Sequence, residues 1–346
     1  MLETVEIAAA SGRSQILIGT PLEALTDRLA GSPAVVVTDR TVRRLHGRRF
    51  PANVPVLLAE QGERRKSLRT VARLYVRLLA AGVDRSTWIV GVGGGVVCDL
   101  AGFVASTILR GVPFAFAPTT LLAQADAAIG GKNGVNIRNY KNMAGTVHQP
   151  RFVLCDLSIL ATLPPAELRN GFAEIVKAAA VADSGLFKFL ERNVGALLRL
   201  EPVSAARAVA GSVRVKAAVV GRDEEDRGER KILNFGHTIG HALEKTQRIP
   251  HGLAVAAGMS LAAEISVRRG MLAEEEARRL ERLLAAFGLP ARPGRRMKAA
   301  KVLDAVFHDK KKTGDAIDFV LLRSIGRAVV EPIRTSELEE ILRDLR

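Results

Sequence analysis

The chain has few cysteines and few aromatic residues. Its two cysteines, Cys98 and Cys155, are too few for a disulfide framework and lack CxxC spacing. We therefore expect both to be small core residues in a reducing cytoplasm. Phe, Trp and Tyr make up 4% of the residues, and no basic stretch is interleaved with rings that could stack on bases. This scarcity argues against a nucleic-acid-binding protein.

Membrane-directing segments are also missing. No apolar run approaches the ~18 residues that a membrane span needs. The first residues, MLETVEIAAASGRSQ, contain no basic region followed by an apolar stretch, as a secretory signal would. These absences predict a soluble, cytoplasmic protein that does not bind a membrane.

The charge of the chain is one-sided. Lys and Arg total 51 against 36 Asp and Glu, which gives a formal net charge of +15. The basic residues are dispersed along the whole chain. Net charge is therefore the one feature of the sequence that favours a nucleic-acid partner. A positive field would also draw small polyanionic substrates toward a cleft.

The first half of the chain alternates short apolar runs with helical patterns. Such runs are typical of strands buried on both faces of a mainly parallel sheet. They lie at 33–39, 54–60, 88–95, 114–120 and 151–156, and a clear helical pattern occupies 67–82. The alternation predicts a Rossmann-like α/β domain over residues 1–163, whose ligand binds at the carboxyl ends of the strands.

Helical periodicity dominates after residue 163. It is clearest at 184–200 and 274–288, and the segment 317–333 has the pattern of a strand pair or an extended segment. We therefore expect a mostly α-helical second domain over residues 164–346.

The stretch GVGGGVVCDLAGF (91–103) follows a predicted strand and opens a helix. Its glycines would let a diphosphate approach the backbone, and a helix N-terminus favours negative charge. However, Val96 fills the third glycine position of the GxGxxG fingerprint, and the usual acidic ribose partner is missing. By itself the stretch fits a tight strand–helix turn as well as a nucleotide site.

A second polar stretch, DAAIGGKNGVNIRNYKNMAG (126–145), places two lysines and several amides among glycines. A solvated surface loop would explain this composition. Lysines and amides in a glycine-rich loop also suit phosphate and hydroxyl groups. We expect a loop here that contacts a phosphorylated, hydroxylated ligand.

Three of the six histidines lie close together, at positions 237, 241 and 251. His237 and His241 are four residues apart in a predicted helix, so both could bind one metal ion. The glutamate of an HExxH zinc site is missing, because Thr238 stands in its place, but Glu174 lies upstream. The cluster favours a metal or catalytic role over isolated structural histidines.

Together these stretches resemble the 3-dehydroquinate synthases, a family of sugar-phosphate cyclases. The matching motifs occur in collinear order over most of the chain. They are QGERRK (61–66), GGGVVCDLAGF (93–103), LRGVPF (109–114), PTTLLAQADAAIGGK (118–132), YKNMAG (140–145), LPPAELRNGFAEIVK (163–177), LNFGHTIGHALE (233–244) and HDKK (308–311). The order of the motifs is more specific than any one of them.

The resemblance implies a fold like that of these synthases and three groups of site residues. Zn²⁺ or Co²⁺ would be held by Glu174, His237 and His251, which leaves His241 facing the substrate. The implied catalytic residues are His241, Lys177, Asp126 and Lys132. The implied NAD-binding residues are Asp39, Glu63, Lys66, Gly95, Asp99, Thr119, Thr120, Lys132, Lys141 and Thr162. The implied substrate-binding residues are Arg110, Lys132, Lys141, Asn142, Lys216, Arg230, Asn234 and one of Lys310 or Lys311.

The resemblance also implies the reaction. The family converts 3-deoxy-D-arabino-heptulosonate 7-phosphate to 3-dehydroquinate and phosphate, a lyase step of the shikimate pathway. The reaction begins with transient oxidation of the substrate by NAD⁺ and elimination of phosphate. Re-reduction and an intramolecular aldol step then complete it. Arg110 matches an arginine that reaches the neighbouring subunit's substrate, so a homodimer is expected. Two other functions stay open: a cyclase for sedoheptulose 7-phosphate or a similar substrate, and a metal-dependent polyol dehydrogenase of the same fold.

Two positions depart from the family pattern. Leu253 replaces the glutamate that usually follows the third metal ligand in HGE, which removes a carboxylate that could orient a ligand. Asn133 follows Lys132 where threonine is more common. Neither departure changes a residue of the implied site.

Overall fold

The structure is a computed structural model that describes residues 2–138, 140–290, 303–304, 306, 312–313 and 316–344. The chain forms two compact units. The first comprises Met1–Leu168 and Pro202–Glu225, and the second comprises Arg169–Glu201 and Asp226–Arg346. The sequence predicted a single domain boundary near residue 163. In the structure the chain instead returns to the first unit at Pro202–Glu225, most of which is one long helix. No described helix has the length and apolar character needed to cross a bilayer.

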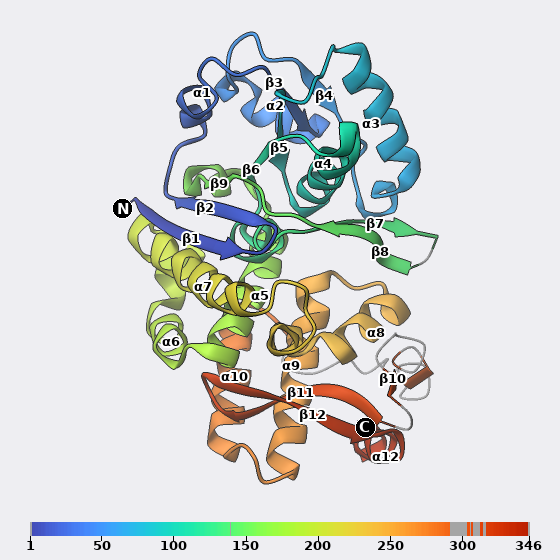
Figure 1. The fold of residues 1–346 in the computed structure, drawn as a ribbon. Helices are drawn as coiled ribbons and strands as arrows, with labels where there is room; N and C mark the ends of the chain where they lie inside the picture. The colour runs from blue at the N-terminus through green and yellow to red at the C-terminus, as the bar shows by residue number, and fades with distance from the viewer. Residues whose placement is uncertain are drawn as a thin grey trace. The chain divides into compact units, whose positions relative to one another are not determined.

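A seven-stranded sheet with the order β1-β2-β9-β6-β5-β3-β4 forms the centre of the first unit (Figure 1). Neighbouring strands are parallel except for the β1–β2 hairpin. The strands are β1 (Glu3–Ala9), β2 (Gly12–Ile18), β3 (Ala34–Thr38), β4 (Val56–Leu58), β5 (Trp88–Gly93), β6 (Phe114–Pro118) and β9 (Phe152–Cys155). The five predicted apolar runs are confirmed as β3, β4, β5, β6 and β9.

The direction of winding reverses at β3, the strand next to the β4 edge of this sheet. β3 pairs with β4 on one side and with β5 on the other. In doubly wound sheets, ligands bind beside the carboxyl ends of the strands at such a reversal. Here those ends are Thr38 of β3, followed by Asp39, and Gly93 of β5, followed by Gly94.

Helices of the first unit connect the strands. They are α1 (Leu25–Arg28), α2 (Arg40–His46), α3 (Leu68–Ala80), α4 (Gly95–Thr107) and α7 (Pro202–Arg222), with short helices η1 (Leu22–Ala24), η2 (Gly47–Arg49), η3 (Glu63–Arg65), η4 (Ile108–Arg110), η5 (Ala123–Ala127) and η6 (Leu157–Thr162). α3 confirms the predicted helix, and the side chain of Ser67 caps it by accepting a hydrogen bond from the Thr70 amide. α7 packs against β1 and β2, which explains why Pro202–Glu225 belongs to this unit.

The stretch 126–145 is not the loop that the sequence predicted. From Lys132 onward it forms the antiparallel hairpin of β7 (Lys132–Ile137) and β8 (Tyr140–Val147). Gly134 lies opposite Gly145 in the register, and a Cβ at Gly145 would come within 2.5 Å of the Asn133 carbonyl oxygen. Small residues are therefore needed for this close pairing, and they hid the alternation that identifies strands.

Asn133 attaches this hairpin to α4. Its side-chain amide donates to the carbonyl oxygens of Gly131 and His148. A Cβ at Gly102 of α4 would lie 1.9 Å from the Asn133 side-chain oxygen. Asn133 is thus buried against α4, whereas the adjacent Lys132 is exposed, as alternation along a strand requires.

The second unit is mostly helical, as predicted. Its helices are α5 (Pro165–Ala182), which begins just before the boundary, α6 (Ser184–Leu198), η7 (Glu229–Asn234), α8 (His237–Gln247), α9 (His251–Arg268), α10 (Glu274–Ala286) and α12 (Thr335–Asp344). α6 and α10 confirm the clearest helical patterns. The predicted strand pair is β11 (Ala316–Ser324) and β12 (Arg327–Arg334), joined by the short β10 (Lys312–Thr313) in one antiparallel sheet.

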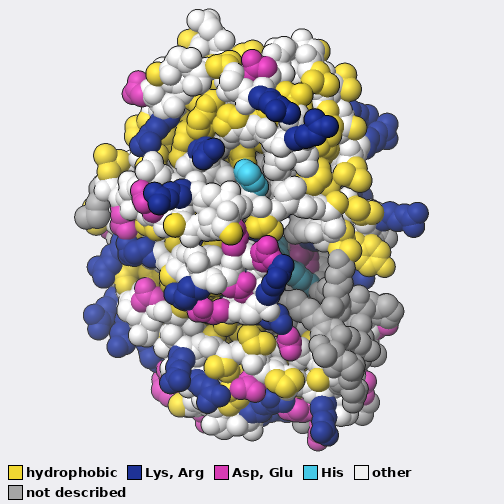
Figure 2. All heavy atoms as spheres, in the orientation of Figure 1, with side chains coloured by type: hydrophobic (Ala, Val, Ile, Leu, Met, Phe, Trp, Pro, Cys, Tyr) yellow, Lys and Arg dark blue, Asp and Glu magenta, His cyan; other side chains and the backbone are white. Residues whose placement is uncertain are grey.

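Apolar packing fixes α5 and α9 in this unit. The ring of Phe172 on α5 stacks on Phe287, with centroids 4.5 Å apart. α9 packs against α8, α10 and β11. Basic side chains lie scattered among acidic and apolar ones on the face shown in Figure 2, in keeping with their spread along the sequence.

Candidate active site

Three predicted metal ligands meet in the second unit. Glu174 lies on α5 with 1% of its surface exposed, and His237 and His251 are the first residues of α8 and α9. One ligand atom from each residue lies within 4.8 Å of the other two. Residues far apart in the sequence are thus brought to one point, as a metal site requires.

Glycines allow α8 and α9 to place their histidines so close together. A Cβ at Gly258 of α9 would lie 2.0 Å from the Gly236 carbonyl oxygen, and one at Gly240 of α8 would lie 3.0 Å from the Ala254 carbonyl oxygen. The two helices therefore contact each other through their backbones. The chain reverses between them through Arg248, which has a left-handed conformation with φ of 55°.

Both histidines turn the same ring nitrogen toward Glu174. Nε2 of His237 lies 3.7 Å from Glu174 Oε1, and Nε2 of His251 lies 3.2 Å from it. One carboxylate and two imidazoles form a donor set that suits Zn²⁺ or Co²⁺. Three protein ligands would leave further coordination positions open, as in catalytic rather than structural zinc sites.

Positively charged groups lie beside the carboxylate of Glu174. Burial by itself would lower the pKa of His251, but hydrogen bonds to Glu174 and Glu244 outweigh it and raise the pKa to about 9. Lys177, one helical turn after Glu174 on α5, is buried and forms an ion pair with it. The carboxylate of Glu174 is therefore already matched by positive groups.

His241 is the third histidine of the cluster. It is exposed, and its ring centroid lies 5.2 Å from that of His237 and 6.1 Å from that of His251. Within the part of the chain that the structure describes, the metal-ligand group does not include it. An imidazole beside a metal site, rather than in it, is available to contact a bound ligand.

Other predicted residues of the second unit lie on η7. Arg230 is buried with 4% exposure, and Asn234 ends the helix two residues before Gly236. The predicted Lys310 and Lys311 lie outside the described residues.

In the first unit, two of the predicted NAD residues, Asp39 and Gly95, lie just after the strands β3 and β5, where the sheet reverses. Asp39 follows β3 and caps α2 by accepting a hydrogen bond from the Val42 amide. β5 leads through Gly94 into α4, and Cβ atoms at Gly93 and Gly94 would lie 2.6 Å from Val97 and 3.1 Å from Thr120. This glycine turn at a helix N-terminus fits a dinucleotide diphosphate in its chemistry and its place in the fold.

A chain of polar contacts joins predicted NAD residues to the β7–β8 hairpin. The buried Lys66 forms an ion pair with Asp99 and donates to the side chain of Asn142. Burial raises the pKa of Asp99, and Lys66 partly opposes this rise. Asn136 donates to Glu63 and accepts from the Asn142 amide, at 2.8 and 2.9 Å. The position of Asn142 is therefore coupled to Glu63, Lys66 and Asp99.

The remaining predicted residues of the first unit occupy separate places. Lys216 of α7 forms an ion pair with Asp126 and donates to its carbonyl oxygen at 2.7 Å. Thr162 contacts His46 Nε2 at 3.1 Å. Thr119 is buried after β6 and Thr120 lies beside Gly94, whereas Lys132 and Lys141 are exposed on the hairpin and Arg110 is exposed at the end of η4.

Sequence reasoning did not identify two residues that contact the predicted site residues. Glu244 lies 3.3 Å from His251 Nδ1, and Asn136 links Glu63 to Asn142. Glu244 carried a readable signal, since it follows His237 and His241 at helical spacing on one face of α8. The link through Asn136 depends on the β7–β8 pairing, which the sequence did not reveal.

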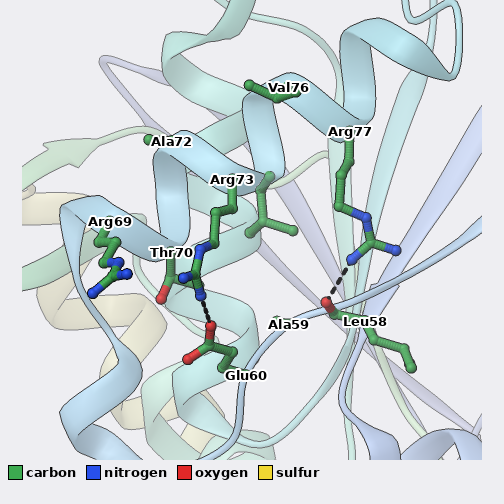
Figure 3. A pocket seen from close by; sticks show the side chains of 10 residues that line it. Leu58, Ala59, Glu60, Arg69, Thr70, Ala72, Arg73, Val76 and Arg77 are labelled. Carbon is green, nitrogen blue, oxygen red and sulfur yellow. Dashed lines mark hydrogen bonds and ion pairs between the residues drawn. The ribbon is translucent and has the colours of Figure 1, made fainter.

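A separate hollow of the first unit lies between α3 and residues 58–60. It has a volume of about 630 Å³ and is lined by Leu58, Ala59 and Glu60 and by α3 (Figure 3). Arg73 pairs with Glu60, and Arg77 donates to the Leu58 carbonyl oxygen at 2.9 Å. No predicted site residue lines it, so we do not assign chemistry to it.

Comparison with known proteins agrees with this arrangement. The family model for 3-dehydroquinate synthase N-terminal matches residues 56–170, and that for 3-dehydroquinate synthase C-terminal matches residues 171–312. A 3-dehydroquinate synthase of Dehalococcoides mccartyi is 42% identical over 352 residues, which cover 97% of this chain and 98% of the relative.

Solved structures of related enzymes share the fold. The complex of 2-deoxy-scyllo-inosose synthase with carbaglucose-6-phosphate, NAD⁺ and Co²⁺ has a TM-score of 0.88 at 27% identity, covering 99% of this chain and 100% of that one. The 2-epi-5-epi-valiolone synthase of Streptomyces hygroscopicus, with NAD⁺ and Zn²⁺, has a TM-score of 0.87 at 30% identity, covering 99% and 97%. The resemblance seen in the sequence motifs is confirmed: the chain belongs to the 3-dehydroquinate synthase family.

Proposed function

We propose that this protein is a 3-dehydroquinate synthase, a carbon–oxygen lyase of the shikimate pathway and so of chorismate and aromatic amino acid biosynthesis. Its substrate would be 3-deoxy-D-arabino-heptulosonate 7-phosphate, and its products 3-dehydroquinate and phosphate. The group formed by Glu174, His237 and His251 carries the proposal, because it assembles three metal ligands beside a buried lysine and a third histidine. Membership of the family supplies the substrate class.

NAD⁺ and a divalent metal, Zn²⁺ or Co²⁺, are the proposed cofactors. The two structural relatives described above hold NAD⁺ with Co²⁺ or Zn²⁺. When bound, NAD⁺ would take and return a hydride, and the metal would act as a Lewis acid. The proposed NAD-binding residues are Asp39, Glu63, Lys66, Gly95, Asp99, Thr119, Thr120, Lys132, Lys141 and Thr162, and the proposed metal ligands are Glu174, His237 and His251.

The substrate carries a phosphate, a carboxylate and several hydroxyls, and the proposed contacts match these groups. Lys216 and Arg230 would bind the carboxylate, since cationic hydrogen-bond donors favour it. Arg110, Lys132, Asn142, Asn234 and one of Lys310 or Lys311 would bind the rest of the substrate. His241 would move a proton, and Lys177, Asp126 and Lys132 would assist catalysis.

We also propose a cytoplasmic homodimer. Four apolar side chains of the β7–β8 hairpin are exposed, namely Ile137, Tyr140, Met143 and Val147, and Tyr140 has 56% of its surface accessible. Exposed apolar side chains on both faces of the hairpin support contact with a second copy. The two cysteines are free and buried, which suits a reducing compartment.

One assay tests the reaction. The purified protein is incubated with the heptulosonate phosphate, NAD⁺ and Zn²⁺, and phosphate release and product identity are followed. Stoichiometric phosphate and 3-dehydroquinate without net NADH are expected. Preference for sedoheptulose 7-phosphate would establish the alternative cyclase, and net NADH from a simple polyol would establish a dehydrogenase.

A further inference from the structure

Glu244 lies beside the metal ligands without belonging to them. It is on the same face of α8 as His237 and His241, at the i, i+4 and i+7 spacing of one helical stripe. Its Oε2 is 3.3 Å from His251 Nδ1, and its side chain is only 17% exposed. The reversal after α8 brings His251 back to this carboxylate.

Each of the two proposed metal-ligand histidines must adopt the tautomer that leaves Nε2 free to bind a metal. A histidine that binds a metal through Nε2 must carry its proton on Nδ1, and an acceptor at Nδ1 fixes that state. His237 Nδ1 lies 3.3 Å from the Phe235 carbonyl oxygen, which is part of the backbone. His251 Nδ1 has the side chain of Glu244 at the same distance.

We propose that Glu244 is a positioning residue for His251. Resting on the metal site of the proposed function, Glu244 accepts the Nδ1 proton and holds Nε2 toward Glu174. Its negative charge also makes the imidazole a stronger donor to a metal.

The consequence differs for the two histidines. No substitution removes the backbone acceptor of His237, whereas one substitution removes the acceptor of His251. Without Glu244, the ring could take the other tautomer or rotate, and Nε2 would no longer be held for the metal. Loss of this kind of partner typically weakens metal binding by ~10- to 100-fold.

Zinc affinity tests the proposal without using turnover. Metal-free wild type, Glu244→Ala and Glu244→Gln compete with a zinc-binding indicator dye, and the Co²⁺-loaded forms are compared by visible absorption. Glu244→Ala is expected to bind zinc ~10- to 100-fold more weakly and to change the Co²⁺ bands. Glu244→Gln should recover part of the affinity, because its amide oxygen can still accept the Nδ1 proton.

Glu264→Gln is the matched control. Glu264 lies on α9 like His251 but pairs with the exposed Arg268, so its substitution should leave zinc affinity and the Co²⁺ spectrum unchanged. Wild-type affinity and spectrum in both Glu244 variants would overturn the proposal. So would a loss of affinity that only follows a lower melting temperature of the metal-free protein, with an unchanged spectrum. A wild type that binds zinc but leaves the heptulosonate unconverted would overturn the proposed function alone.

Discussion

His237 and His241 lie one turn apart on α8, yet only His237 belongs to the metal-ligand group. We predict that His237→Ala loses bound zinc, because one of three protein ligands is gone. His241→Ala should keep the zinc and lose rate, by ~10²-fold or more if His241 moves a proton. Elemental analysis after dialysis and steady-state rates on the same samples separate the two effects.

His148→Ala is a suitable control for this pair, because His148 lies in the first unit beside Phe114. It should keep both zinc and rate. Equal zinc loss from His237→Ala and His241→Ala would mean that both imidazoles bind the metal, and the ligand set would need revision.

Arg230 gives a prediction about substrate identity. It is buried on η7, where a charge-assisted hydrogen bond to a substrate carboxylate is worth about 1.5–3 kcal/mol. Arg230→Ala should therefore lower kcat/KM for the heptulosonate phosphate by at least ~10-fold. Trace activity on sedoheptulose 7-phosphate, which has no carboxylate, should barely change.

The measurement compares kcat/KM for both substrates in wild type, Arg230→Ala and Arg230→Lys. Lysine should rescue only partly, because it offers a point charge instead of a planar fork. Equal loss of both activities in Arg230→Ala would remove the carboxylate role.

At this scale the sequence alone left the metal site undecided. The spacing of His237 and His241 allowed both to bind one ion, and nothing in that spacing pointed to Glu174. The resemblance to the family selected Glu174 and His251 instead, and the structure brings these atoms within reach of one another. Contacts such as Glu244 with His251 depend on a chain reversal whose geometry a linear pattern does not contain.

The elements that hold the ligands depend on close helix packing. We predict that Gly258→Ala separates α8 from α9, because the new methyl would lie 2.0 Å from the Gly236 carbonyl oxygen. Rotation of a side chain cannot relieve contact with a backbone atom, so overpacking should cost about 1–3 kcal/mol of unfolding free energy. Zinc affinity should fall as well, since His237 and His251 begin these two helices.

Chemical denaturation and zinc competition measure the two effects. Gly195→Ala is the control, because it lies exposed on α6 and its methyl would meet only the end of Arg199 at 3.5 Å. Alanine there should leave zinc affinity intact and be neutral or slightly stabilising. Wild-type stability and zinc affinity in Gly258→Ala would contradict the prediction and show that the ligands do not depend on this close contact between α8 and α9.

Element prediction succeeded where apolar character was continuous. Apart from the partly buried Trp88, every residue of β3, β5, β6 and β9 is buried, so each of these strands appears in the sequence as a continuous apolar run. β7 and β8 were missed because they are polar, glycine-rich strands whose pairing satisfies the backbone. The place of α7 was missed because its packing on β1 and β2 is a tertiary contact that its own periodicity cannot specify.

At the scale of the whole molecule, the proposed dimer involves both the exposed β7–β8 hairpin and Arg110, a proposed substrate-binding residue. The hydroxyls of Ser106, near the end of α4, and Thr146 of β8 are hydrogen-bonded at 2.7 Å. This contact fixes the β7–β8 hairpin to the end of α4, which continues directly into η4. Leu109 and Arg110 have left-handed φ values of 51° and 67°, a conformation that bulky residues rarely adopt. Arg110 is exposed at the end of η4, so its guanidinium is accessible to a neighbouring subunit.

Mixed dimers test whether Arg110 acts on the partner's substrate. Arg110→Ala and His237→Ala should each be inactive alone, the first for want of a substrate contact and the second for want of metal. In a mixed dimer, the subunit with intact His237 would receive Arg110 from its partner, so one of its two sites would be complete. Random mixing after reversible dissociation should therefore restore about a quarter of wild-type activity, because about half of the dimers are mixed in a twofold assembly. Light scattering measures the dimer, and Tyr140→Asp should shift it toward monomer by placing a charge on the exposed hairpin. If mixing restores no activity while the dimers exchange subunits, Arg110 serves its own chain and the shared site is ruled out.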